Sequence, residues 1–113
     1  MKESNIKRDA LISKDKKHRY SLKRIWDDKK PKVLFIMLNP SLANSDQDDP
    51  TVRRLINFTK KLGYGGFYVG NLFSYITPYP KDLLNQDLSY CNKNLKEIRK
   101  MIALSNEVIY GWG

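Results

Sequence analysis

The chain has 113 residues, with 21 Lys and Arg against 12 Asp and Glu, one His and one Cys, and a formal net charge of +9 at pH 7. This length suits a single domain, and the 41% of apolar and 12% of aromatic residues suffice for a core, which argues against wholesale disorder. One Cys cannot form an intrachain disulfide, no Cys/His cluster offers a structural zinc site, and the longest apolar run, residues 33–38, is too short to span a membrane. We expect a cytoplasmic protein that holds no metal or cofactor and has no membrane partner.

The positive charge is concentrated in the N-terminal third. Residues 1–32 carry 12 basic and 5 acidic side chains. Tyr20 and Trp26 lie among these cations, a mixture that favours nucleic acid because aromatic rings stack on bases while cations bind phosphates. The basic residues that we expect to contact nucleic acid, most plausibly DNA, are Lys14, Lys16, Lys17 and Arg19. The alternatives are a solvated arm, or an arm that packs its aromatic residues on the core with its charges outward.

The chain begins with an arm that precedes one domain. Residues 1–17 are polar without a clear period, so we expect a flexible basic arm, followed by a single α/β domain over residues 18–113. At the start of this domain, residues 18–26 suit an edge strand or irregular coil. Residues 33–38 are a continuous apolar run, which predicts a strand buried on both faces of a sheet.

The middle of the chain predicts a helix and a second strand. Asp49 suits a helix cap and Pro50 the first helical residue, and apolar residues then recur at helical spacing. Gly63 ends this helix. Residues 67–73 follow as a second buried strand.

The last third predicts a loop, a helix and a third strand. Pro78, Pro80 and Asn85 mark the loop, residues 89–105 have helical spacing, and residues 108–110 form a short strand. The alternation of strands and helices predicts a small three-layer parallel sheet with flanking helices. A third strand without a further covering helix makes the chain look curtailed at its C-terminus. It leaves an open sheet edge on which a protein partner could dock.

In open parallel sheets, ligands bind beyond the C-terminal ends of the strands, so the loops at these ends form the candidate site. Asn39, beside a Pro at a strand tip, could orient a water or bind the edge of a planar ligand. Asn71 lies in an apolar run, where a buried amide needs partners. The other loop residues that we expect to bind nucleic acid or another ligand are Ser41, Arg53, Arg54, Phe73, Tyr75 and Trp112.

Plainer structural roles compete with these assignments. Asn39 can hold its own turn, Asp49 is explained as a helix cap, the two arginines can form a solvated helix face, and the aromatic residues can belong to the core. His18 has no sequence neighbours that make it a ligand or base, so we expect it at the surface. The chain has no P-loop, GxGxxG, HExxH or GxSxG motif, so metal, nucleotide and serine chemistry lack positive support.

An ordered set of motifs spans about residues 18 to 113. The motifs are Arg19-Tyr20 with Leu22, Arg24 and Trp26, then Leu34 to Ser41 with Ala43, Asp49-Pro50-Thr51 with Arg53, Gly63 to Gly66, Asn71-Leu72-Phe73 and Trp112-Gly113. This set resembles the bacterial and phage family called domain of unknown function 1643. The family name implies no activity.

A more distant similarity is to the uracil-DNA glycosylase superfamily, whose mismatch-specific branch has Asn-Pro after its first strand, as Asn39 and Pro40 stand here. The resemblance implies that Asn39 orients the attacking water, that Asn71 reads a base edge, and that Phe73 stacks on a base flipped out of the duplex. Both families continue to a further strand and a His-Pro motif that stabilises charge on the departing base. This sequence ends before that segment.

Three functions follow as expectations. The first is a nucleic-acid-binding protein with a glycosylase-like α/β fold that acts on DNA bases when the missing segment is supplied. The second is a non-catalytic accessory subunit that binds DNA and a larger replication or repair enzyme. The third and weakest is a small-molecule nucleotide hydrolase, in which the basic residues would have no role.

Overall fold

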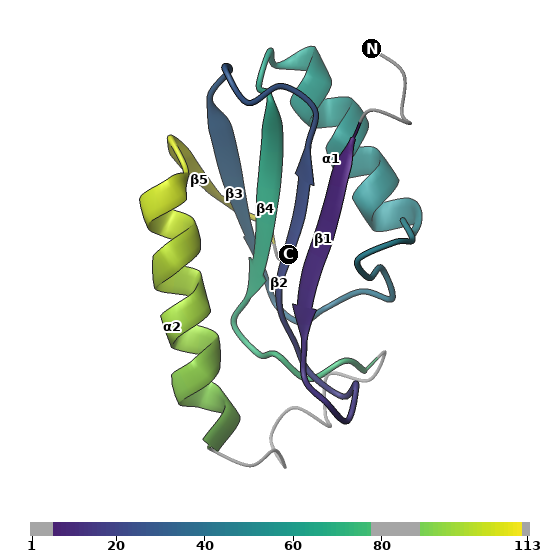
Figure 1. The fold of residues 1–113 in the computed structure, drawn as a ribbon, viewed down its shortest axis with the longest axis vertical. Helices are drawn as coiled ribbons and strands as arrows, with labels where there is room; N and C mark the ends of the chain where they lie inside the picture. Colours follow the sequence, from purple (N-terminus) through teal and green to yellow (C-terminus); the bar gives the residue numbers. More distant parts are fainter. Residues whose placement is uncertain (1–5, 78–88, 112–113) are drawn as a thin grey trace.

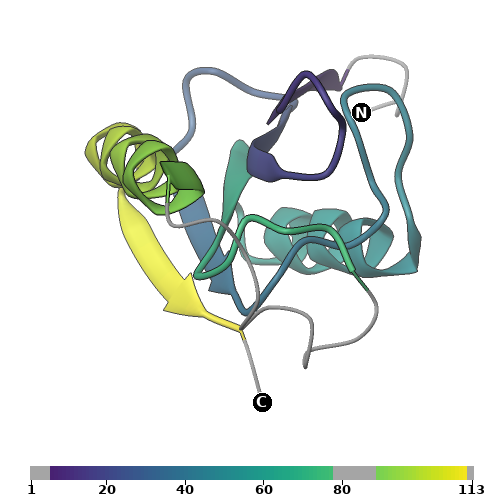
Figure 2. The same cartoon turned by 90° about the horizontal axis from the view of Figure 1, so that it is seen from below.

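The structure, a computed structural model, describes residues 6–77 and 89–111. Its elements in chain order are β1 (Lys7–Ile12), β2 (Arg19–Ile25), β3 (Lys32–Met37), α1 (Pro50–Lys61), β4 (Gly66–Asn71), α2 (Ser89–Leu104) and β5 (Glu107–Tyr110). The five strands form one sheet in the order β1-β2-β4-β3-β5, and the sheet lies between the two helices (Figures 1 and 2). The fold is therefore a three-layer α/β arrangement, as the sequence predicts.

The sheet is mixed, which corrects the prediction of a parallel sheet. β3 pairs in parallel with both β4 and β5, whereas β2 runs antiparallel to β1 and to β4. The difference arises at the N-terminus, where β1 and β2 form a hairpin. β2 is an interior strand rather than an edge strand or coil, and β1 lies in the segment expected to be a flexible arm. Side chains along β1 alternate between exposed and half-buried positions, as on an edge strand.

The core is divided by the sheet into two apolar clusters. The cluster on the α1 side includes Val33, Phe35, Val52, Ile56, Phe67 and Val69. The cluster on the α2 side includes Leu34, Ile36, Ile98 and Met101. Because successive side chains of a strand point to opposite faces, β3 contributes alternately to both clusters and is buried on both faces.

The helix boundaries agree with the sequence. Asp49 caps α1 by accepting a hydrogen bond from the Val52 amide at 2.9 Å, and Pro50 is the first helical residue. Gly63 follows the end of α1 with a φ of +84°, a conformation that glycine adopts without strain. The predicted loop residues between 78 and 88 and the predicted site residue Trp112 lie outside the described residues. Within the described part of the chain, neither helix combines the length and apolar character that crossing a membrane requires.

Candidate functional site

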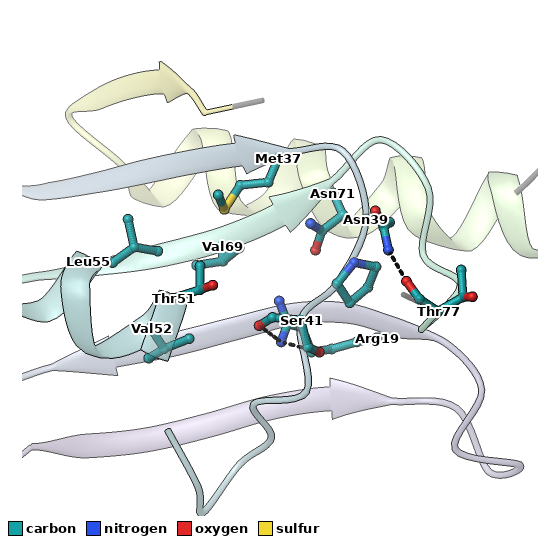
Figure 3. Close-up of a pocket in the computed structure, with 11 residues that line it drawn as sticks. Arg19, Met37, Asn39, Ser41, Thr51, Val52, Leu55, Val69, Asn71 and Thr77 are labelled. Atoms are coloured by element: carbon teal, nitrogen blue, oxygen red, sulfur yellow. Dashed lines mark hydrogen bonds between the residues drawn. The ribbon is translucent and has the colours of Figure 1, made fainter. Parts of the chain in front are cut away.

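A cavity of about 270 Å³ lies where the parallel strands β3 and β4 end. The two strands are in register, with Met37 opposite Asn71, so the residues that follow them come together at one edge of the sheet. The polar side chains of the lining are Arg19, Asn39, Ser41, Thr51, Asn71 and Thr77 (Figure 3). The apolar side chains are Met37, Pro40, Val52, Leu55 and Val69. The cavity is thus lined by both polar and apolar side chains, and it lies at the edge of the sheet where the sequence analysis expects ligands to bind.

The two predicted asparagines line this pocket together. Asn39 is half-buried, and its Nδ2 donates a hydrogen bond of 2.6 Å to the carbonyl oxygen of Thr77. Asn71 is only 1% exposed, and its Nδ2 has no hydrogen-bond partner. The backbone of Asn71 is held from the other side by α2, where Asn94 Nδ2 donates to the Asn71 carbonyl oxygen at 2.7 Å. Asn71 therefore lines the pocket and has a buried amide donor without a partner.

Arg19 supplies the charge in the pocket. It is 1% exposed, so it does not lie on the surface with the lysines with which the sequence groups it. Its Nη1 donates to the carbonyl oxygen of Ala43 at 2.9 Å and to Ser41 at 3.4 Å, but its Nε has no partner. Burial lowers the pKa of Arg19 to about 10, against the opposing effect of Asp49. The guanidinium is still a cation at neutral pH.

The loop after β3 forms one wall of the pocket and is held by hydrogen bonds at its C-terminal end. At its C-terminal end the Asp49 carboxylate accepts hydrogen bonds from the backbone amides of Val52, at 2.9 Å, and Ala43, at 3.2 Å. Burial raises the pKa of Asp49, but these hydrogen bonds and one from Ser41 outweigh it and lower the pKa below its ordinary value. Asp49 is therefore a charged cap, as expected.

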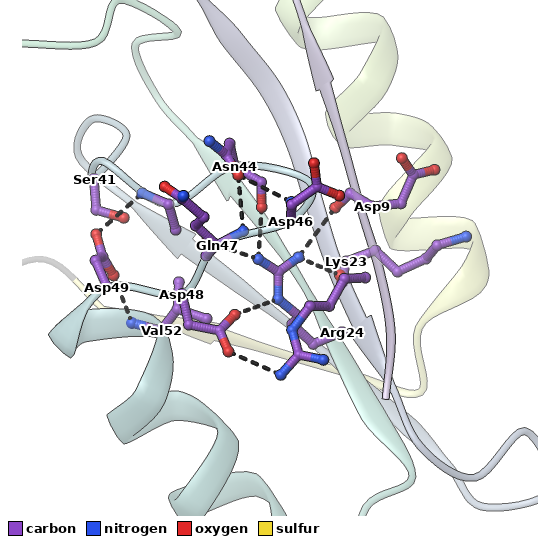
Figure 4. Close-up of polar contacts among 12 residues, drawn as sticks. Asp9, Lys23, Arg24, Ser41, Asn44, Asp46, Gln47, Asp48, Asp49 and Val52 are labelled. Atoms are coloured by element: carbon purple, nitrogen blue, oxygen red, sulfur yellow. Dashed lines mark hydrogen bonds and ion pairs between the residues drawn. The ribbon is translucent and has the colours of Figure 1, made fainter. Parts of the chain in front are cut away.

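A second buried arginine holds the middle of the same loop (Figure 4). Arg24 is fully buried on β2, and its Nε donates to Asp48 at 2.7 Å. Its Nη2 donates to the carbonyl oxygens of Asn44, at 2.6 Å, and Gln47, at 3.2 Å. Arg8 on β1 completes an ion pair with the other oxygen of Asp48 at 3.0 Å. The hairpin thus fixes the loop that forms the pocket wall.

Other predicted residues lie elsewhere. Arg53 and Arg54 are exposed on α1 and do not line the pocket, and Phe73 is partly exposed just beyond β4. Tyr75 is half-buried and packs against His18, with ring centroids 5.5 Å apart. This pairing belongs to the structural role that the sequence left open for Tyr75.

Two aromatic expectations need correction. His18 is buried rather than at the surface, because its Nδ1 is 2.8 Å from the Ser74 hydroxyl and its ring stacks on Tyr20. Tyr20, which lies among the cations of the N-terminal third, is also buried, so it packs on the core as in the alternative left open by the sequence and is not available to stack on bases. Trp26 is half-buried and donates its Nε1 to the carbonyl oxygen of Tyr64 at 3.1 Å. All three aromatic rings therefore stabilise the hairpin and its surroundings.

The predicted lysines are exposed on the turn between β1 and β2. Lys14 and Lys16 line a groove of about 530 Å³, together with residues 42–46 of the loop after β3. Lys17 is exposed beside them. Since Ser41 lines the pocket and Leu42 lines the groove, the two hollows share this loop as a common wall.

Sequence reasoning missed three contributors to the site. Thr51 and Thr77 line the pocket, and the ion pair of Arg24 with Asp48 fixes its wall. The one available signal was the placement of Arg24 two residues after Leu22, which a strand period of two puts on the same face as an apolar residue. Among the described residues, no group of three or more His, Cys, Asp or Glu side chains could hold a metal ion.

The fold and site define a small α/β protein with a mixed sheet and a polar pocket beyond its parallel strands. Comparison with family models shows a match over residues 19–113 to the family described as a protein of unknown function, DUF1643. The chain belongs to this family, which confirms the resemblance seen in its motifs. No curated protein and no solved structure matches the chain.

Proposed function

We propose that the chain is a nucleic-acid-binding protein that takes one DNA base into the pocket between Asn39, Asn71 and Arg19. The observation that carries this proposal is that two residues lining one cavity, Asn71 and Arg19, each have a buried donor, Nδ2 and Nε, without a partner. An unpartnered buried donor costs about 1–3 kcal/mol, so a ligand with acceptor atoms would relieve that cost. The edges of nucleobases carry such acceptors.

The surroundings of the pocket support a nucleic acid over an isolated base. Lys14, Lys16 and Lys17 are exposed on the turn next to the loop that walls the pocket. Lysines at this position would bind phosphates while the base occupies the pocket. A small-molecule nucleotide hydrolase would leave them without a role.

We propose further that the site acts as in a glycosylase, on a base that has been extruded from DNA. The hydrogen bond from Asn39 Nδ2 to Thr77 leaves the amide oxygen as the atom that would accept a hydrogen bond from an attacking water. Asn71 would bind the edge of the extruded base. Support comes from the position of both asparagines at the ends of adjacent parallel strands in one pocket.

The proposal is tested with Asn71→Asp, which keeps the shape of the side chain and replaces the unpartnered donor with an acceptor. We expect at least about a tenfold loss of affinity for fluorescent single- and double-stranded DNA, with and without uracil. Asn106→Asp is the matched control, because Asn106 Oδ1 accepts from the Lys32 amide at the other end of β3 and an aspartate can do the same. Equal affinity of both variants and the parent chain would refute base binding in this pocket.

A non-catalytic accessory subunit is the second candidate, and the sheet edge favours it. β5 lies at the edge beside β3, with Tyr110 65% exposed and Leu104 also exposed at the end of α2. An edge strand offers unpaired backbone groups to a partner strand. Assaying the same DNA for abasic sites separates the candidates. Abasic product that is lost in Asn39→Ala supports the glycosylase form, whereas DNA binding without product supports the accessory form.

A further inference from the structure

Leu42 is the most exposed of the large apolar side chains in the described residues, at 80%. Its neighbours in the loop are held firmly. The carbonyl oxygens of Ser41 and Ala43 both accept hydrogen bonds from buried Arg19, and the Ala43 amide donates to Asp49. The Leu42 side chain is therefore displayed to solvent by a fixed backbone, rather than by a loose loop tip.

This leucine stands between the two hollows. Ser41 lines the pocket of about 270 Å³, whereas Leu42 and Ala43 line the groove of about 530 Å³ on the other side of the loop. The groove has an apolar part, to which Ile12 and Ile76 also contribute. A ligand that continues out of the pocket over this loop would meet Leu42 first and the groove next.

The charges of the groove fit a phosphodiester. Lys14 and Lys16 line it from the turn between β1 and β2, and both are exposed. Asp46 is the acidic residue that lines it from the opposite side, which leaves a net positive charge. Apolar contact beside cations suits a nucleotide, whose base has apolar faces and whose phosphate is an anion.

We propose that the groove binds the nucleotide adjoining the one whose base enters the pocket, and that it binds this nucleotide as single-stranded nucleic acid. Leu42 contacts the face of the second base, and Lys14 and Lys16 contact the phosphate between the two nucleotides. A base face is free for such a contact only where the base is not stacked within a duplex. This inference rests on the proposed function and adds the strandedness and the minimal length of the ligand.

The test compares a deoxynucleoside with the corresponding dinucleotide, for each of the four bases, by titration calorimetry. The dinucleotide adds one phosphate and one base, and we expect it to bind at least about tenfold more tightly. Leu42→Ala should reduce this gain severalfold and leave nucleoside binding unchanged. Leu62→Ala is the control, because Leu62 is also exposed but lies at the end of α1 away from the pocket.

Two further variants probe the phosphate. The double variant Lys14→Gln with Lys16→Gln should lose most of the gain in affinity that the dinucleotide has over the nucleoside. Asp46→Asn should increase that gain above its value in the parent chain. A single-stranded decanucleotide should bind more tightly than its duplex. Equal affinities for nucleoside and dinucleotide, or a preference for the duplex, would refute binding of the second nucleotide in the groove but not binding of a base in the pocket. Failure of every nucleoside and dinucleotide to bind would refute the proposed function and this inference with it.

Discussion

Arg19 and Arg24 both lie on β2, and both are almost completely buried, yet they differ in one respect. The donors of Arg24 are directed to Asp48 and to backbone carbonyl oxygens, and no donor of this residue is left without a partner. Arg19, which lines the pocket, leaves its Nε unpartnered and forms no ion pair with any of the described residues. A buried cation without a paired carboxylate is costly unless a ligand or other acceptor compensates it. The contrast identifies Arg24 as a residue that positions the loop, and it supports the proposal that Arg19 binds a ligand.

The ion pair of Arg24 gives a prediction for stability. Burial raises the pKa of Asp48, but hydrogen bonds from Arg8 and Arg24 outweigh it, so the folded pKa lies below the ordinary value. Asp48 therefore stabilises the fold at pH values above its unfolded pKa, and this contribution is lost as the pH falls through the folded pKa. Asp48→Asn should lower the free energy of unfolding by about 3 kcal/mol at neutral pH, because it leaves Arg24 buried without its anion.

Chemical denaturation at neutral pH and at several values below about pH 5 measures this effect. The stability of the parent chain should fall with pH more steeply than that of Asp48→Asn. Asp28→Asn is the control, since Asp28 pairs with Lys7 on the surface at 2.8 Å, and we expect no measurable change. Parallel pH dependences of the parent chain and Asp48→Asn would contradict the prediction.

Residue by residue, the sequence predicts the uncharged polar residues of the site better than its charged residue. Asn39, Ser41 and Asn71 meet in the pocket because parallel strands end at one edge of a sheet, a rule that needs no knowledge of distant contacts. The burial of Arg19 depends on carbonyl oxygens of the loop at residues 41–43, more than twenty positions along the chain. A cluster of basic residues does not reveal which of its members turns inward.

At the scale of elements, local sequence signals are sufficient to predict where α1 begins and ends. The cap at Asp49, the proline at Pro50 and the glycine at Gly63 are chemical signals contained within a few residues, and α1 has the predicted bounds. β1 gave no such signal, because its sequence is half charged and its partner is a strand across a turn. β2 was obscured by its two buried arginines, which hide the apolar pattern of an interior strand.

The cap of α1 also carries the pocket wall, which gives a second prediction. Asp49→Ala removes the acceptor of the Val52 and Ala43 amides, so we expect the free energy of unfolding to fall by about 2 kcal/mol. Asp46→Ala, in the same loop but exposed, should leave stability unchanged. Thermal unfolding followed by circular dichroism measures both. Equal stability of the two variants would show that the loop does not depend on the cap.

At the scale of the whole molecule, the proposed contact between nucleic acid and the exposed lysines of the turn between β1 and β2 predicts how binding responds to salt. Replacing Lys14, Lys16 and Lys17 with Gln should reduce the slope of log affinity against log salt by about 2 for single-stranded DNA, since each lost phosphate contact contributes about 0.7. The matched control replaces three exposed lysines outside this turn, Lys29 and Lys30 between β2 and β3 and Lys61 at the end of α1. A salt slope that is equal in the two triple variants would exclude the turn from the nucleic-acid interface.

The strand order has a consequence for synthesis of the chain on the ribosome. β1 and β2 are neighbours in sequence and can pair as soon as both have emerged, but β3 pairs only with β4 and β5. The apolar residues 33–36 therefore have no sheet partner until β4 has also emerged from the ribosome. When β4 emerges, it can pair with β2 of the hairpin on one side and with β3 on the other. A pause in translation after β3 has emerged from the ribosome and before β4 has emerged would therefore prolong the interval in which β3 is open to aggregation.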